Sequence, residues 1–192
     1  MGLTLSASGR PLLYYLTADI APSIVAELDS SEWQLTPQFN QLRYITNPTP
    51  DSALANLTTS ILAQQYRLLE QIWDGFIQRH VWAGTSLSQL LAHSQPYCEI
   101  LKDLPGMTTS VHVDHRSCIT AGMLFFNTVD NELQSTSFYA SEKGDNALRM
   151  SSQLAHGWYT ANWHKSWHKG SNSSTTIRYA VKFGLHLPMI NP

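Results

Sequence analysis

A histidine and an aspartate stand two residues apart, at His112 and Asp114, in a β-prone run that we place at residues 109–115. Side chains two apart on a strand point to the same face, so the imidazole and the carboxylate are expected to project together. Such a pair can bind one metal ion if a third ligand comes from elsewhere in the chain. Two histidines and one carboxylate on one face of an octahedron leave three positions open for further ligands.

The C-terminal region supplies another histidine and a cation. His168 precedes Arg178 by ten residues, and Arg178 belongs to an expected strand at 175–185. The apolar residues of that strand share one face, which should pack against helices: Ile177, Tyr179, Val181 and Phe183. Arg178 lies on the inner face, where a guanidinium requires an anion because an unpaired buried charge is costly. A carboxylate held through two parallel hydrogen bonds fits this requirement.

The elements that must position these residues change character near Tyr97. The first half is predicted to be mainly helical, with helices at 22–28, at 87–92, and from a cap at Asp51 or Ser52 to about Trp73. In the second half, short β-prone runs alternate with turns, at 99–104, 109–115, 119–127, 136–140, 157–163 and 175–185. We therefore expect a mainly β fold with flanking α-helices, a jelly roll of cupin-like type backed by N-terminal helices. One domain would span 1–192, with 1–96 as helical support and 97–186 as the β core.

The order of these motifs is similar to that of a known family. Pro105-Gly106 is followed after five residues by His112-x-Asp114, then after about fifty residues by His168, and after nine more by Arg178-Tyr179. This order resembles the 2-oxoglutarate/Fe(II)-dependent oxygenases, especially small prolyl-4-hydroxylase-like proteins of phages and bacteria. The resemblance covers about residues 97–186. It implies a double-stranded β-helix.

The resemblance also implies a site and a reaction. His112, Asp114 and His168 would bind Fe(II), and Arg178 would bind the distal carboxylate of 2-oxoglutarate. Dioxygen would be the second cosubstrate, with ascorbate as an accessory reductant. The reaction would hydroxylate a C–H bond and yield succinate and carbon dioxide. The retained acidic ligand Asp114 disfavours the related halogenases, which carry a small residue there.

One departure from the family pattern concerns the residue two after the arginine. Many relatives have Arg-x-Ser, whose hydroxyl contacts the cosubstrate, whereas Ala180 stands here. We therefore expect another hydroxyl to assist, with Tyr97, Thr120 and Tyr139 as the candidates. Residues near the ligands in sequence are candidates for contacting substrate: Arg116, Trp158 and Trp167.

Two other interpretations stay open from the sequence. One is a cupin-like metal-binding protein without oxygenase activity. The other is a zinc hydrolase that uses His164, His168 and a carboxylate, although Lys165 stands where the glutamate of HExxH would be. His164 also remains an alternative to His168 as the third iron ligand.

Composition limits the partners. Net charge is −2 and charged residues make up 14% of the chain, with no basic block, so a general nucleic-acid-binding surface is not predicted. No apolar run is long enough to span a membrane. Because there is no charged start followed by an apolar stretch, we expect a cytoplasmic protein. The resemblance implies a small-molecule or peptidyl substrate. The sequence predicts neither the substrate nor the oligomeric state.

Overall fold

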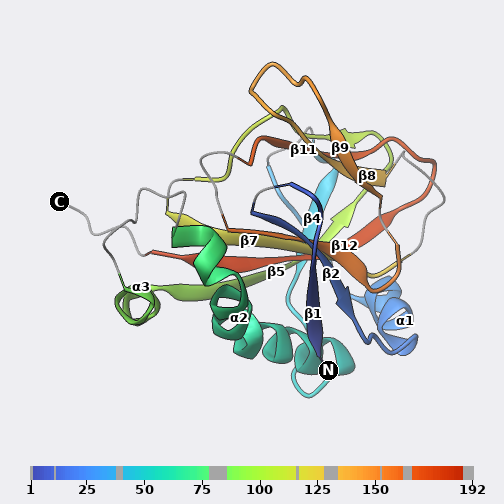
Figure 1. Ribbon diagram of the computed structural model, residues 1–192. Helices are drawn as coiled ribbons and strands as arrows, with labels where there is room; N and C mark the ends of the chain where they lie inside the picture. The colour runs from blue at the N-terminus through green and yellow to red at the C-terminus, as the bar shows by residue number, and fades with distance from the viewer. Residues whose placement is uncertain are drawn as a thin grey trace.

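Two antiparallel β-sheets face each other, and helices cover the far side of the larger one (Figure 1). The computed structural model describes residues 2–10, 12–37, 41–77, 86–115, 117–127, 134–151, 153–161 and 166–187. The larger sheet has the order β1-β2-β10-β7-β12-β5-β4-β3, and the smaller one has the order β6-β11-β8-β9. The expected mainly β, jelly-roll-like class is confirmed.

The strand bounds are as follows. In the larger sheet they are β1 Leu3–Ala7, β2 Leu13–Ala18, β3 Gln34–Leu35, β4 Arg43–Thr46, β5 Gln95–Asp103, β7 Cys118–Phe125, β10 His156–Thr160 and β12 Arg178–His186. In the smaller sheet they are β6 Met107–Thr108, β8 Gln134–Phe138, β9 Leu148–Ser151 and β11 His168–Asn172.

The three predicted helices are confirmed as α1 Ser23–Ser30, α2 Ala53–Ile77 and α3 Leu87–His93. Of the two cap candidates for α2, Ser52 performs the role, because its hydroxyl accepts a hydrogen bond from the Ala55 amide at 3.1 Å. Helical spacing brings the apolar residues of α2 to one buried stripe: Leu54, Leu57, Ile61, Leu68, Leu69 and Ile72. This stripe packs against the outer face of the larger sheet. No helix in the described ranges is long and apolar enough to cross a membrane.

Strand β12 divides the interior into two cores. It pairs with β5 on one side and β7 on the other. Tyr179, Val181 and Phe183 pack into the cluster that contains α2, as the alternation predicted. Ala180 faces the second cluster, between the two sheets, with Leu101 from β5. The inner face of β12 therefore looks into the space where a site can form.

Two sequence expectations need correction. The first half contributes four strands, β1 to β4, in addition to its helices. β1 pairs with β2 and β3 pairs with β4, and these two pairs join the sheet through β10 and β5, which lie far away in sequence. The predicted strand at 109–115 is absent, and after β6 the chain leaves the smaller sheet except for a single bridge between His112 and His168.

Candidate metal centre

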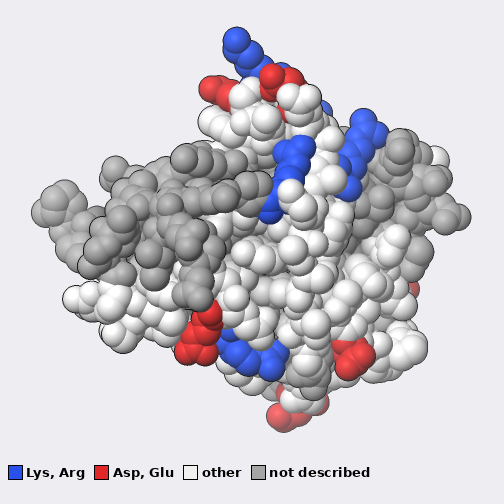
Figure 2. Space-filling model, viewed as in Figure 1, with Lys and Arg blue, Asp and Glu red and all other residues white. Residues whose placement is uncertain are grey.

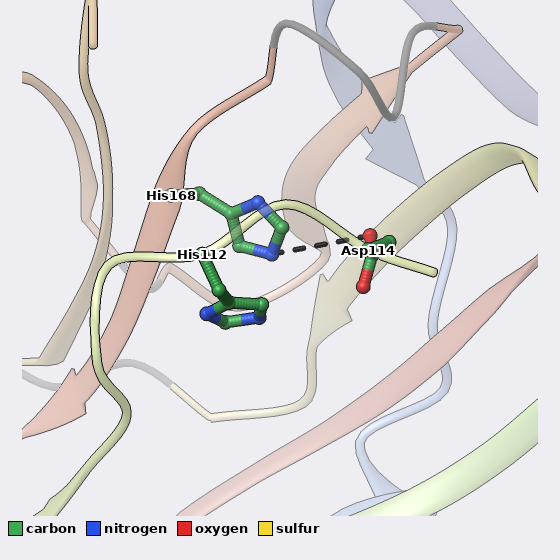
Figure 3. A group of neighbouring side chains, drawn as sticks. All are labelled: His112, Asp114 and His168. Carbon is green, nitrogen blue, oxygen red and sulfur yellow. Dashed lines mark ion pairs between the residues drawn. The ribbon is translucent and has the colours of Figure 1, made fainter. Parts of the chain in front are cut away.

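Three side chains converge at one end of the space between the sheets (Figure 3). His112 and Asp114 come from the segment after β6, and His168 begins β11. One ligand atom from each residue lies within 4.8 Å of the others. Nε2 of His168 is 3.9 Å from Oδ2 of Asp114, and the two imidazole centroids are 4.4 Å apart. This cluster is a two-histidine, one-carboxylate set suited to a metal with open positions.

Backbone hydrogen bonds bring the two histidines together. The His112 amide donates to the His168 carbonyl at 2.9 Å, and the His168 amide donates back to the His112 carbonyl at 2.8 Å. Each ring is then oriented by a carbonyl two residues earlier. Nδ1 of His112 is 2.8 Å from the Ser110 carbonyl, and Nδ1 of His168 is 2.7 Å from the Ser166 carbonyl. A carbonyl only accepts, so both Nδ1 atoms carry hydrogen and both Nε2 atoms keep a lone pair for a metal.

The charge states also suit a metal. Burial by itself raises the pKa of Asp114, but Lys182, His168 and His112 outweigh it and hold that pKa below the usual carboxyl value. Burial lowers the pKa of His168 below that of a free imidazole. The two groups are therefore an ionised carboxylate and a neutral imidazole at neutral pH, and these are the forms that bind metals.

The carboxylate of Asp114 faces two different partners. Its Oδ2 is directed to His168, while its Oδ1 lies 3.5 Å from Nζ of Lys182 on β12. Lys182 stands four residues after Arg178, so it lies on the same inner face of the strand. One oxygen of Asp114 is thus placed for a metal and the other for a cation.

A pocket opens beside the three ligands. Its cavity volume is about 70 Å³, and its mouth is open to solvent. The ligands and residues from both sheets line it: Arg43, Thr109, His112, Asp114, Met123, Thr136, Trp158, His168, Gly170 and Lys182. Its wall is therefore mixed, with apolar side chains near the metal ligands and two cations.

Arg178 lies in a row of charges across the larger sheet. In the strand register, Asp103 of β5 stands opposite both Arg43 of β4 and Arg178 of β12. Arg43 donates to Oδ1 from Nε at 2.6 Å and to Oδ2 from Nη2 at 3.0 Å. Arg178 donates to Oδ2 from Nε at 3.1 Å and from Nη2 at 2.5 Å. The anion that a buried Arg178 requires is thus Asp103.

This row borders the pocket at the side of Arg43, which we call the deep end because Asp103 and Arg178 are almost fully buried there. Arg43 lines the pocket directly. Arg178, which is fully buried, stands behind Gly170, since a methyl group on Gly170 would lie 3.7 Å from its Nη2. Burial raises the pKa of Asp103, but Arg178 and Arg43 more than offset this, so the pKa stays below the usual carboxyl value. The three side chains therefore form one ionised unit.

The hydroxyl candidates from the sequence do not gather at the pocket. Thr120 accepts from the Leu185 amide at 3.0 Å and lies on the helix-facing side of β7. Tyr139 lines a groove elsewhere, on the outer face of the smaller sheet. Tyr97 is on the inner face of β5 and stacks on His186, outside the residues that line the pocket. Thr109 and Thr136 are the hydroxyl residues that line it.

The substrate candidates fare unequally. Trp158 lines the pocket and lies 5.6 Å from the His168 ring, centroid to centroid. Trp167 precedes His168, and its carbonyl accepts from the Tyr139 amide, but it does not line the pocket. Arg116 and His164 lie outside the described residues.

Two pocket cations were missed in the sequence, for different reasons. The sequence could have predicted Lys182, because the alternation that places Arg178 on the inner face of the strand also places Lys182 there. Arg43 belongs to β4, in the half expected to be helical, and only the pairing of β4 with β5 brings it to the site. No local pattern signals that pairing.

Comparisons with known proteins bear on the fold. Neither a protein-family model nor a curated protein matches the sequence. Solved structures do. The dioxygenase for auxin oxidation 1 from Arabidopsis thaliana, in a binary complex with 2-oxoglutarate, has a TM-score of 0.64 at 11% identity, covering 95% of this chain and 85% of that one. A prolyl-4-hydroxylase from Pseudomonas putida gives 0.59 at 10% identity, with 91% and 92% covered.

A third structure carries ligands. HygX from Streptomyces hygroscopicus, with nickel and 2-oxoglutarate bound, gives a TM-score of 0.58 at 10% identity, with 93% of this chain and 84% of that chain covered. The likeness at this identity is one of fold. The chain therefore has the fold of the 2-oxoglutarate/Fe(II) oxygenases, prolyl hydroxylases among them, and it carries a His-Asp-His cluster between its two sheets.

Proposed function

We propose that this protein is an Fe(II)- and 2-oxoglutarate-dependent dioxygenase that hydroxylates a C–H bond of a peptidyl residue, an amino acid or a small metabolite. The observation that carries the proposal is the His112, Asp114 and His168 cluster, whose three ligand atoms lie within 4.8 Å of one another. Three protein ligands leave room for a chelating 2-oxo acid and dioxygen. The bound iron, 2-oxoglutarate and dioxygen would supply the oxidation, with succinate and carbon dioxide as coproducts and ascorbate as an accessory reductant.

The protein's own residues would orient and ionise the ligands. The carbonyls of Ser110 and Ser166 hold the imidazoles with Nε2 toward the metal position. Lys182 contacts the oxygen of Asp114 that faces away from His168, which keeps the carboxylate ionised and fixes its rotation. Met123 and Trp158 supply apolar wall beside the ligands. A wall of this kind excludes water from an oxidising site.

The remote carboxylate of 2-oxoglutarate would be received at the deep end of the pocket. The resemblance assigns this role to Arg178. Because Asp103 already holds Arg178, we propose that Arg43, Asp103 and Arg178 act together as the anion anchor, with Arg43 as the member that faces the pocket. Gly170 leaves the space through which the carboxylate approaches Arg178.

The test is spectroscopic and chemical. Under anaerobic conditions, adding Fe(II) and then 2-oxoglutarate should produce a weak charge-transfer band in the visible range. Admitting air should then form succinate. His112→Ala and Asp114→Ala should abolish both signals, whereas the matched control His156→Ala changes an exposed histidine at the start of β10 and should retain them. A protein that binds Fe(II) but gives neither a band nor succinate would leave the cupin-like metal-binding alternative.

A further inference from the structure

A second concave site lies on the outer face of the smaller sheet, away from the pocket between the sheets. Its volume is about 460 Å³, and it is formed by β6, β8, β9, β11 and the residues just beyond them. The residues that argue for its chemistry are Thr108, Ser135, Ser137, Arg149, Lys169 and Ser171. We call this site the outer groove.

Strand alternation separates the outer groove from the metal centre. On β11, His168 and Gly170 line the inner pocket, whereas Lys169 and Ser171 line the groove. On β8, Thr136 faces inward and Ser135 and Ser137 face outward. The same two strands therefore present one set of residues to each site.

Among the described residues that line the outer groove, the charged ones are Lys169 and Arg149, both cations. In the strand register, Ser137 stands between Lys169 of β11 and Arg149 of β9. Neighbouring strands are about 4.8 Å apart, so the backbone positions of Lys169 and Arg149 lie about 10 Å from each other, one on each side of the serine. None of the described residues that line the groove is acidic. Figure 2 shows Asp and Glu as well as Lys and Arg side chains at the end of the molecule where β8, β9 and β11 lie, so the single sign belongs to the lining of the groove.

The floor of the groove offers hydroxyl groups. Ser135 and Ser137 are only 2% and 7% exposed, although both line the groove. Within the described part of the chain, no hydrogen bond joins the hydroxyl of either serine, or that of Ser171, to another residue. All three serines line the groove, so their hydroxyls can donate to a ligand with several acceptor atoms.

We propose that the outer groove binds a phosphate group. A tetrahedral dianion has the acceptor oxygens for the serine hydroxyls and the charge for Lys169 and Arg149, and a guanidinium can hold two of its oxygens at once. The phosphate is either free inorganic phosphate or a phosphate monoester on an organic molecule. The volume of about 460 Å³ leaves room for the organic part. This site is independent of the proposed oxygenase chemistry.

The test uses the metal-free, full-length protein and amide chemical shifts. Inorganic phosphate and glycerol 3-phosphate are titrated separately, with sodium chloride at matched ionic strength as the blank. The expected result is saturable shifts at residues of β8, β9 and β11. Tighter binding of glycerol 3-phosphate assigns the site to a monoester, and equal binding assigns it to the free ion.

Charge-neutralising variants locate the binding. The double variant Lys169→Gln, Arg149→Gln should weaken binding by about tenfold or more. Lys143→Gln, an exposed lysine in the neighbouring loop, should not weaken it. Lys182→Gln controls for phosphate entering the inner pocket and should also have no effect. The proposal is overturned if chloride produces the same shifts, or if the Lys143 or Lys182 variant weakens binding as much as the double variant.

Discussion

The two ends of the inner pocket satisfy their polar groups in opposite ways. At the metal end, His112, Asp114 and His168 direct ligand atoms at a common point. At the deep end, Asp103 is held by two arginines through four hydrogen bonds of 2.5 to 3.1 Å. The metal end thus requires a ligand to complete it, whereas the deep end completes itself. The comparison teaches that a fully buried arginine, taken alone, is weaker evidence for a bound cosubstrate than three converging ligand atoms.

The largest effect should come from breaking the self-completed end. Asp103→Ala leaves two arginines without their shared anion in a buried position, and such a loss costs about 3–5 kcal/mol of unfolding free energy. Urea denaturation of the metal-free protein measures it. Asp145→Ala, at a fully exposed carboxylate, is the control and should stay near wild type. A loss in Asp103→Ala no greater than the control would contradict the proposed role of the row.

Removing a metal ligand should reduce metal affinity strongly and stability only weakly. We expect His168→Ala to lower Fe(II) affinity by more than about 100-fold, with a smaller loss of unfolding free energy than Asp103→Ala. Equilibrium dialysis with Fe(II) under anaerobic conditions gives the affinity. His115→Ala, an exposed histidine beside Asp114, should bind as wild type does. If His115→Ala lowered Fe(II) affinity as much as His168→Ala, the cluster would not be the metal centre.

The anion anchor predicts a separation of cosubstrate from metal. Arg43→Gln removes the cation that faces the pocket, so 2-oxoglutarate affinity should fall about tenfold or more while Fe(II) affinity is kept. Titration of the charge-transfer band measures the first quantity and dialysis the second. Lys102→Gln is the matched control on the neighbouring strand, since Lys102 lies over the Trp33 ring instead. Unchanged 2-oxoglutarate affinity in Arg43→Gln would exclude Arg43 from the anchor.

A single added methyl group at Gly170 can fill the space beside Arg178. A methyl group on Gly170 would meet Nη2 of Arg178 at 3.7 Å, an ordinary contact, so Gly170→Ala should fold normally. It should nevertheless reduce 2-oxoglutarate affinity several-fold, because the added carbon occupies the deep end of the pocket. The same titration checks this. If affinity is unaffected, the carboxylate does not approach through this space.

Acid should weaken the deep end. The pKa of Asp103 is below its usual value in the folded protein, so its contribution to stability is complete above the unfolded carboxyl pKa, near 3.9, and is lost as pH falls through the folded value. Unfolding free energy measured from pH 6 to pH 3 should therefore fall less steeply in Asp103→Asn than in wild type. Parallel slopes would show that Asp103 is not a source of the acid sensitivity.

The comparison also explains what the sequence could predict. His112, Asp114, His168 and the inward direction of Arg178 follow from spacing and from the family resemblance, and the helices follow from apolar periodicity. The partner of Arg178 could not be predicted from spacing. Asp103 ends a strand 75 residues away, and only the register of β5 against β12 brings the two residues together. Arg43 is further removed, since its strand is short and half-buried and lies in a region dominated by helix signals.

The main-chain bridge between His112 and His168 has a consequence for how metal and folding relate. It joins two points far apart in the chain through two backbone hydrogen bonds that need no metal. The loop-closure entropy of bringing the ligands together is therefore lost when the sheets form, before any ion arrives. Metal capture then becomes a local event on a preorganised chelate, unlike the metal-driven folding of small zinc domains. A chelator should therefore remove the ion without unfolding the jelly roll.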